Sequence, residues 1–162
     1  LSGPATFGHI FAAKSIFVTL MGVTQLLVLF TVGILVFRIE IAGSYAGLAL
    51  MTIACAYCAA GLGMLIFSLS SSNSQANAIT LILVLSMSAL GGSWFPTYFM
   101  PAWMQFASMF TINYWAMDGF MQIMWFGSEF AGVLLQACVL LITGSMLFIL
   151  SWLIVRKKPM YN

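Results

Sequence analysis

The sequence predicts an all-α, polytopic membrane protein with about four transmembrane helices. Two observations predict this fold class. Of the 162 residues, 63% are hydrophobic and only 5% are charged, whereas an ordinary soluble domain has about 25% charged residues. In addition, several uncharged stretches exceed the roughly 20 residues that a helix needs to cross the hydrocarbon core. A chain of this composition has too few polar side chains to cover a water-exposed surface, so we expect one transmembrane domain over residues 1–162.

The segment 1–14 predicts a short interfacial helix ahead of the first long apolar run. A helix here brings apolar side chains and one lysine to the same side: Phe7, Ile10, Phe11 and Lys14. Amphipathic helices of this kind lie in the plane of the membrane surface. The chain begins with Leu1 and shows no signal-peptide architecture, so we expect it to begin inside a longer polypeptide.

Four apolar segments predict the membrane spans. The first two cover residues 15–37 and 45–69, and the last two cover residues 78–95 and 130–155. The second is rich in alanine, glycine and cysteine, whose small side chains allow helix backbones to approach closely. A polar stretch, 70–77, separates the second span from the third and predicts a loop, with Asn73 or Ser74 as the N-cap of the next helix.

The region 97–127 is too polar for a span and too apolar for a loop in water. Two short helices fit it, at residues 102–110 and 114–126, and neither is long enough to cross a membrane. The preceding span should end at a glycine pair and a proline, since proline prevents an orderly continuation: Gly91, Gly92 and Pro96. On the second short helix, polar and aromatic side chains form one stripe: Trp115, Asp118, Gln122 and Trp125. We therefore expect a re-entrant external helical hairpin.

Basic residues predict the orientation. They stand next to a span near both ends of the chain: Lys14 before the first span, and Arg156, Lys157 and Lys158 after the last. An even number of spans puts both ends on one side, and the positive-inside rule makes that side cytoplasmic. We expect an integral protein of a bacterial inner membrane, with the hairpin outside. The basic cluster beside a span also explains the net charge of +2 without a nucleic-acid partner.

The sequence lacks the motifs of nucleotide, metal or catalytic sites. A phosphate-binding P-loop ends in Gly-Lys-Ser/Thr, and no lysine in this chain follows a glycine. Cys55 and Cys58 are spaced like a metal or redox pair, but they lie within an apolar span, and the single histidine, His9, is in another segment. A structural zinc site needs four ligands, so we interpret the two cysteines as packing residues. We predict no catalytic, cofactor-binding or metal-binding residue and no enzyme activity of this chain.

Asp118 allows two interpretations. An acidic residue within a membrane usually has a function, and Asp118 lies in an amphipathic helix between Trp115 and Trp125. If that helix floats at the membrane surface instead, an acid there costs little and needs no function.

Three segments occur here in a recognisable order. The first is Pro4 to Lys14, which runs directly into a span. The second is Ser74-Gln75-Ala76, which opens a span that ends in Gly-Gly-Ser-Trp-Phe-Pro at residues 91–96. The third is Met100-Pro101-Ala102-Trp103, followed by residues 114–120. Together they resemble the membrane permease of ABC type-2 exporters, in which a coupling helix, a Gly-Gly-x-x-x-Pro segment, a Pro-x-Trp and a re-entrant external hairpin occur together.

This chain departs from the family in two ways. Many relatives have a proline where this chain reads Thr111-Ile112-Asn113. The family has six spans, so the chain resembles the C-terminal two-thirds of a permease that lacks the first two spans.

The resemblance implies a permease subunit of an ATP-driven exporter. Two permease chains, identical or different, form the pathway, and separate ATP-binding subunits hold ATP and Mg. It implies that the ATPase-coupling residues are Pro4, Phe7, His9, Ile10 and Lys14. It implies that the hairpin lies as a lid over the pathway, whose residues are Gly91, Gly92, Pro96, Trp115, Asp118 and Gln122. The substrate stays open between a drug, a lipid, a glycan and an ion. The alternative is a four-helix scaffold or channel without ATP coupling.

Overall fold

Four helices of the structure are long and apolar enough to cross a membrane, which confirms the predicted fold class. The computed structural model describes residues 7–157, and no residue in that range lies in a β-strand. The long helices are α1 (Phe7–Leu35), α2 (Tyr45–Leu69), α3 (Asn73–Leu90) and α6 (Leu134–Lys157). The short elements are α4 (Ala102–Ser108), α5 (Ile112–Met124) and the 3₁₀ turns η1 (Thr97–Phe99) and η2 (Phe130–Val133).

The helices α2 and α6 form the tightest pair in the bundle. They approach through two glycines, since a Cβ atom added to Gly61 would lie 2.8 Å from the carbonyl oxygen of Gly144. One hydrogen bond also crosses this contact, from the Ser151 hydroxyl to the Met64 carbonyl oxygen, at 2.8 Å. The small side chains of α2 thus allow close backbone packing, as the sequence predicts.

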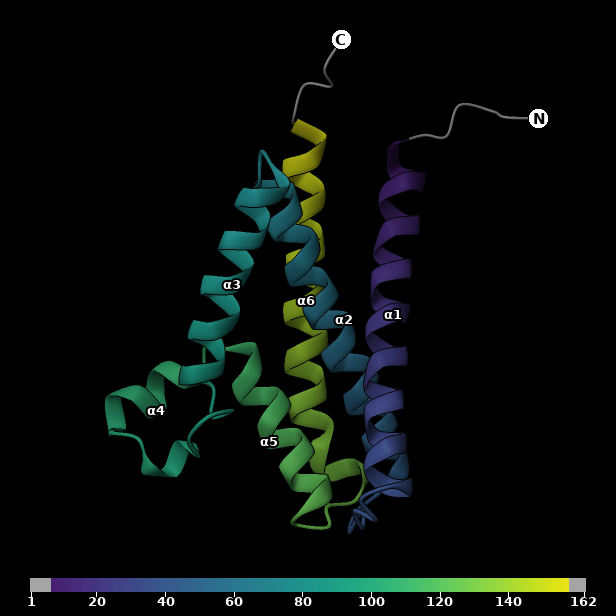
Figure 1. Cartoon of the computed structure of the whole chain (residues 1–162), viewed down its shortest axis with the longest axis vertical. Coiled ribbons are helices and arrows are strands. Elements are labelled where there is room, and N and C mark those ends of the chain that lie inside the picture. The colour runs from purple at the N-terminus through teal and green to yellow at the C-terminus, as the bar shows by residue number, and fades with distance from the viewer. Residues whose placement is uncertain (1–6, 158–162) are drawn as a thin grey trace, which may run out of the picture.

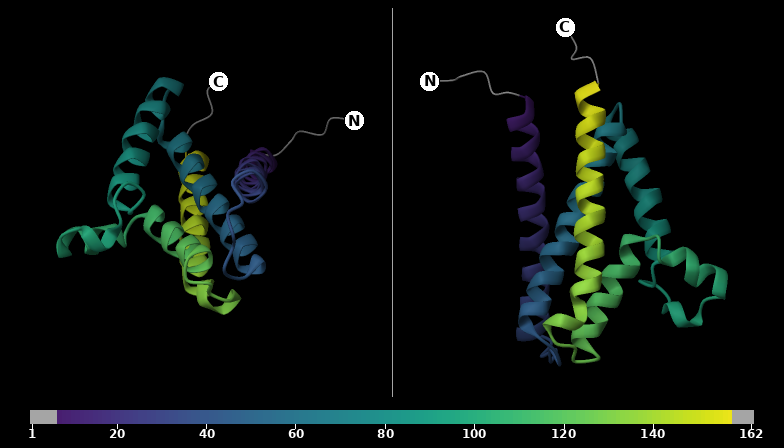
Figure 2. Two further views of the ribbon diagram at one scale, coloured as in Figure 1. Left: turned by 60° about the horizontal axis from the view of Figure 1, so that its bottom comes forward. Right: turned by 180° about the vertical axis from the view of Figure 1, so that it is seen from behind.

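Helix α1 packs more loosely, on one side of α2 (Figures 1 and 2). None of its residues whose burial is described is buried. It contacts α2 at Gly22, where an added Cβ would lie 3.2 Å from the Ala56 Cβ. Most of its surface is therefore available to lipid or to other proteins.

The predicted interfacial helix is not a separate element within the described residues. Residues 7–14 are the first turns of α1, which continues through Lys14 to Leu35 without a break. The reason is local: Ala12, Ala13 and Lys14 favour a helix, and no proline interrupts it there. Residues 1–6, including Pro4, lie outside the described residues.

The third span begins and ends earlier than predicted. Helix α3 starts at Asn73, and the Ser72 hydroxyl caps it by accepting a hydrogen bond from the Gln75 amide at 3.2 Å. The helix therefore begins five residues before the predicted position 78, and the predicted caps Asn73 and Ser74 lie inside it. It ends at Leu90, directly before the predicted glycine pair.

The described ends of α1 and α6 lie at the same end of the bundle, together with the connection between α2 and α3 (Figure 1). The connections 36–44 and 125–133 lie at the opposite end (Figures 1 and 2). This is the arrangement that an even number of spans requires. We refer below to the first of these as the basic end, because Lys14, Arg156 and Lys157 lie there.

Candidate functional site

The glycine pair after α3 turns the chain toward the re-entrant region. Gly91 is buried, and an added Cβ would collide with the Cβ of Asn113. Gly92 has a φ of +88°, a backbone conformation that glycine adopts readily and other residues rarely. Position 91 thus needs glycine because there is no space for a side chain, and position 92 needs it because of the positive φ.

Asn113 fastens the start of α5 to the end of α3. Its Nδ2 donates to the hydroxyl of Ser88 at 3.0 Å and to that of Ser93 at 3.2 Å. The Thr111 hydroxyl caps α5 by accepting from the Tyr114 amide at 3.2 Å. This is the segment where relatives have a proline, and here a threonine cap and an asparagine make the bend.

Residues 93–110, which connect the glycine pair to the start of α5, form an arm that extends sideways from the bundle (Figures 1 and 2). Pro96 is exposed and precedes η1. The arm has no charged residue, and most of its large side chains are exposed: Trp94, Phe95, Tyr98, Phe99, Trp103, Phe106, Met109 and Phe110. Such a surface suits contact with lipid or with another protein rather than with water.

In contrast to the arm, α5 is built into the bundle. Ala116, Gly119 and Ile123 are buried, and a Cβ added to Gly119 would overlap the side chain of Met51 on α2. Two short helices are present, as predicted, but α5 lies alongside α2 and α6 and not across their ends (Figures 1 and 2). Helix α5 thus packs between the longer helices through its small residues, and a lid over the outer end of the pathway stays a prediction.

The predicted polar stripe of α5 is used for internal contacts. Asp118 accepts a hydrogen bond at 2.6 Å from the amide of Gln136 on α6. Gln122 accepts one at 2.9 Å from the hydroxyl of Ser128, and the Trp115 indole donates to the Met109 carbonyl oxygen at 2.8 Å. The structure thus brings these residues against α6 and the neighbouring connections, while Trp125 is exposed.

Gln136 is the residue that sequence reasoning missed. Its side chain is only 7% exposed, and its Oε1 has no hydrogen-bond partner among the described residues. A signal was available, because Gln136 is the one side-chain amide between residues 130 and 155, and a polar group within a span usually has a partner on another helix.

The proposed coupling residues lie at the basic end, on the first turns of α1. His9 and Ile10 are exposed, and the Lys14 ammonium lies 5.1 Å from the centre of the Phe67 ring. Pro4 lies outside the described residues, and for Phe7 only its place at the start of α1 is described.

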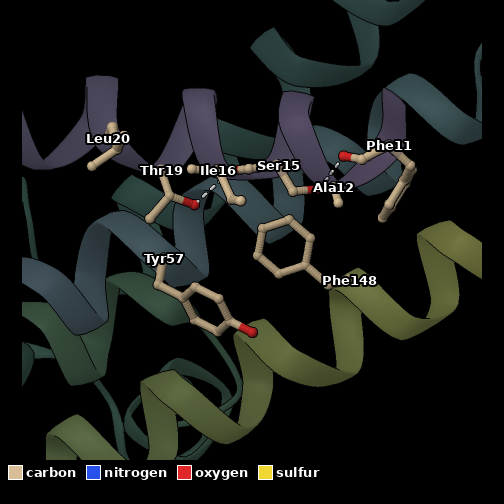
Figure 3. A pocket seen from close by; sticks show the side chains of 8 residues that line it. All are labelled: Phe11, Ala12, Ser15, Ile16, Thr19, Leu20, Tyr57 and Phe148. Atoms are coloured by element: carbon tan, nitrogen blue, oxygen red, sulfur yellow. Dashed lines mark hydrogen bonds between the residues drawn. The ribbon is translucent and has the colours of Figure 1, made fainter. Parts of the chain in front are cut away.

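An apolar groove of about 450 Å³ separates the basic half of α1 from α2 and α6 (Figure 3). One wall is α1, and Tyr57 of α2 and Phe148 of α6 form the other; their rings lie 5.0 Å apart. The groove's α1 wall consists of Phe11, Ala12, Ser15, Ile16, Thr19 and Leu20. Sequence analysis did not predict it, because the walls come from three helices.

Within residues 7–157 no group of three or more histidine, cysteine or acidic side chains is placed to bind a metal ion. Cys55 and Cys58 are unpaired cysteines within α2, and Cys58 is buried in the core, next to Gly144.

These features define a class: a polytopic helical membrane protein with one short helix packed into its bundle from the side. The family model described as "ABC-2 family transporter protein" matches residues 2–153. Because the match covers nearly all of the 162 residues, the chain belongs to the ABC-2 transporter family, and it is an integral membrane component for transport. The resemblance seen in the sequence is thus confirmed. Neither the search of the curated proteins nor the search of the solved structures returns a match.

Proposed function

We propose that this chain is the permease subunit of an ATP-driven exporter, and that separate ATP-binding subunits bind at its basic end. The observation that carries this proposal is the continuity of α1. One unbroken helix leads from the exposed residues His9 and Ile10 through the membrane to Leu35. Because no break interrupts the helix, a push on its first turn can reach its other end.

The packing of α1 supports the same mechanism. Helices α2, α5 and α6 share the buried core, whereas α1 has no described buried residue. A loosely packed helix beside a rigid unit can tilt or slide without breaking the core, which is the shear type of motion in transporters and other switching proteins. In this proposal the ATP-binding partners bind ATP and Mg and supply the energy, and α1 transmits it.

The proposal also includes a second permease chain. Helix α3 has no buried residue along its 18 residues, so it leaves a whole apolar face for a partner. The pathway then lies beside α3 and α5. The residues of the turn after α3 and of α5 position these two helices along the pathway: Gly91, Gly92, Pro96, Trp115, Asp118 and Gln122.

The coupling role can be tested with two isoleucines at opposite ends of the bundle. Ile10 is 46% exposed and Ile39 is 43% exposed, so each can be replaced by aspartate with a similar effect on packing. We expect Ile10→Asp to abolish co-purification with the ATP-binding subunit and to lower transport-linked ATP hydrolysis at least tenfold. Ile39→Asp should change neither by more than twofold.

Equal ATP hydrolysis in Ile10→Asp and the unaltered protein would contradict the coupling role. If no ATP-binding subunit co-purifies with the unaltered protein from its native membrane, the four-helix scaffold or channel becomes the better explanation.

A further inference from the structure

We propose that Asp118 on α5 and Gln136 on α6 form a proton-binding site. When a proton is bound, the acid group of Asp118 donates a hydrogen bond to Oε1 of Gln136 and accepts one from Nε2 of the same amide, so the two side chains close a ring. When the proton leaves to water, only the bond from Nε2 remains. This inference needs neither ATP coupling nor a second permease chain.

The first argument is an acceptor without a donor. The side chain of Gln136 is only 7% exposed, and its Oε1 is buried with no hydrogen-bond partner among the described residues. Leaving such an atom unpaired costs free energy, so buried polar atoms nearly always have a partner. The Nε2 of the same amide donates to Oδ2 of Asp118 at 2.6 Å, which places a carboxyl group directly beside the amide.

The second argument is the chemistry of the carboxyl group. An ionised carboxyl group only accepts hydrogen bonds, whereas a protonated one also has an O–H donor. A proton on Oδ1 of Asp118 therefore supplies the donor that Oε1 of Gln136 lacks. A half-turn of the amide has the same consequence, because its oxygen would then take the position 2.6 Å from Oδ2, and two oxygens at that distance need a proton between them.

The third argument is the apolar surroundings of the pair. A Cβ added to Gly119, the neighbour of Asp118, would lie 3.3 Å from the Cβ of Gln136 and would overlap the side chain of Met51. Ala137, the neighbour of Gln136, belongs to the buried core. A charged group in such a place is costly unless an opposite charge pairs with it, and a proton on Asp118 removes the charge.

The fourth argument is that no ion pair within residues 7–157 balances a charge on Asp118. The bond from Gln136 is the one side-chain polar contact that Asp118 makes in that range. Helix α5 packs against α2, α3, α6 and η2. The titratable or charged residues of these five elements are Tyr45, Cys55, Tyr57, Cys58, Tyr114, Cys138, Arg156 and Lys157. Only Arg156 and Lys157 are basic, and they lie at the basic end, roughly 30 Å along α6 from Gln136.

The pair is accessible from one side. Asp118 is partly exposed, and α5 ends beside the connections 36–44 and 125–133, opposite the basic end (Figure 1). The charged residues of these connections, Arg38, Glu40 and Glu129, are exposed. Protons therefore exchange with the compartment at this end, and loss of the proton weakens the contact between α5 and α6 by one hydrogen bond.

Infrared spectroscopy of the full chain in lipid vesicles tests the proposal, because a protonated carboxyl group has a carbonyl band that an ionised one lacks. The chain has three acidic residues, so a few variants assign the band. At neutral pH we expect one such band, shifted in heavy water and absent from Asp118→Asn. It should move to higher frequency in Gln136→Leu, whose side chain cannot donate to the carbonyl oxygen. The matched control Glu129→Gln also converts an acid into an amide and should leave the band unchanged.

Thermal unfolding tests the ring itself. The amide of Asp118→Asn can donate to Oε1 of Gln136 and accept from Nε2, as the protonated acid does, so we expect its melting temperature to lie within about 1 °C of the unaltered protein. Asp118→Leu has a similar size but makes neither bond, and it should melt about 3 °C lower or more.

An unaltered protein without the carbonyl band, or a band that persists in Asp118→Asn, would overturn the proposal. The same holds if Asp118→Asn melts several degrees above the unaltered protein, since the substitution would then have removed a carboxylate charge from the apolar core. Equal melting temperatures of Asp118→Asn and Asp118→Leu would show that the ring does not form.

Discussion

Helices α1 and α2 have nearly the same apolar character but very different environments. Their most apolar 18-residue stretches have mean hydropathies of 2.1 and 2.0, yet none of that stretch is buried in α1 and 50% of it is buried in α2. Small side chains contribute to the difference, since the buried residues of α2 include Ala54, Ala56, Cys58, Ala60 and Gly61. Apolar side chains allow a helix to cross the membrane, and small side chains allow it to pack closely against another helix.

This comparison divides the chain into a packed unit, formed by α2, α5 and α6, and a periphery, formed by α1, α3 and α4. Substitutions in the packed unit should destabilise the protein, and equivalent substitutions in the periphery should not. The four predictions below use pairs of matched variants, with the free energy of unfolding measured in detergent micelles.

The largest effect is expected at the contact between α2 and α6. Gly61→Val places new methyl groups against the backbone of Gly144, which cannot move aside, so we expect a loss of about 3 kcal/mol, at the upper end for overpacking. Gly63→Val is the control on the same helix, because an added Cβ there meets nothing within 4 Å, and it should change stability by less than about 0.5 kcal/mol. Equal losses in both variants would show that the close contact is not the cause.

A leucine pair compares the core with the periphery directly. Leu140 on α6 is 1% exposed and Leu29 on α1 is 63% exposed. We expect Leu140→Ala to cost about 2–3 kcal/mol through loss of buried contacts and formation of a cavity. Leu29→Ala should cost less than about 0.5 kcal/mol. A similar melting temperature for the two variants would contradict the division.

A glutamine pair tests the polar contact between α5 and α6. Gln136→Leu removes the donor to Asp118 and leaves the carboxylate without this partner, so we expect a loss of about 1–2 kcal/mol. Gln25 on α1 is exposed, and Gln25→Leu should leave stability unchanged or raise it slightly. If Gln136→Leu were neutral, α5 would be held by its apolar contacts alone.

The smallest effect is expected where α1 meets α2. An alanine Cβ at position 22 would lie 3.2 Å from the Cβ of Ala56, and α1 can move outward to make room because its other side is free of described buried contacts. Gly22→Ala should therefore change stability by less than about 0.5 kcal/mol, since the gain in helix propensity offsets the crowding. Gly144→Ala crowds Tyr57 and the Cys58 backbone, so it should lower stability more than Gly22→Ala does. A larger loss in Gly22→Ala than in Gly144→Ala would contradict the division into packed unit and periphery.

The sequence predicts the helices of this protein well because span length and turn chemistry are local properties. Four apolar runs predict four spans, and Gly91-Gly92 marks the end of α3 correctly. The start of α1 was predicted less well. An amphipathic helix and the first turns of a span look alike in sequence. The structure has no break near Lys14, so this residue lies within α1 and does not end a separate helix.

The arrangement of the site was largely beyond prediction. In a soluble helix the polar face shows which side is exposed, but here both the lipid-facing and the buried sides are apolar. The bond between Asp118 and Gln136 joins two helices, and the groove joins Phe11 with Tyr57 and Phe148, residues far apart in the chain. The polar stripe of α5 was recognised, but its partner could be found only from the packing.

The length of α1 makes the protein sensitive to the thickness of its bilayer. Its 29 residues give a rod of roughly 43 Å, against a hydrocarbon core of roughly 30 Å. Hydrophobic mismatch of this size is relieved by tilt or by exposing the end of the helix to the headgroups and water. Lipids with longer acyl chains would draw the first turn, with His9 and Ile10, toward the membrane, so membrane composition sets how much of this turn a partner can reach.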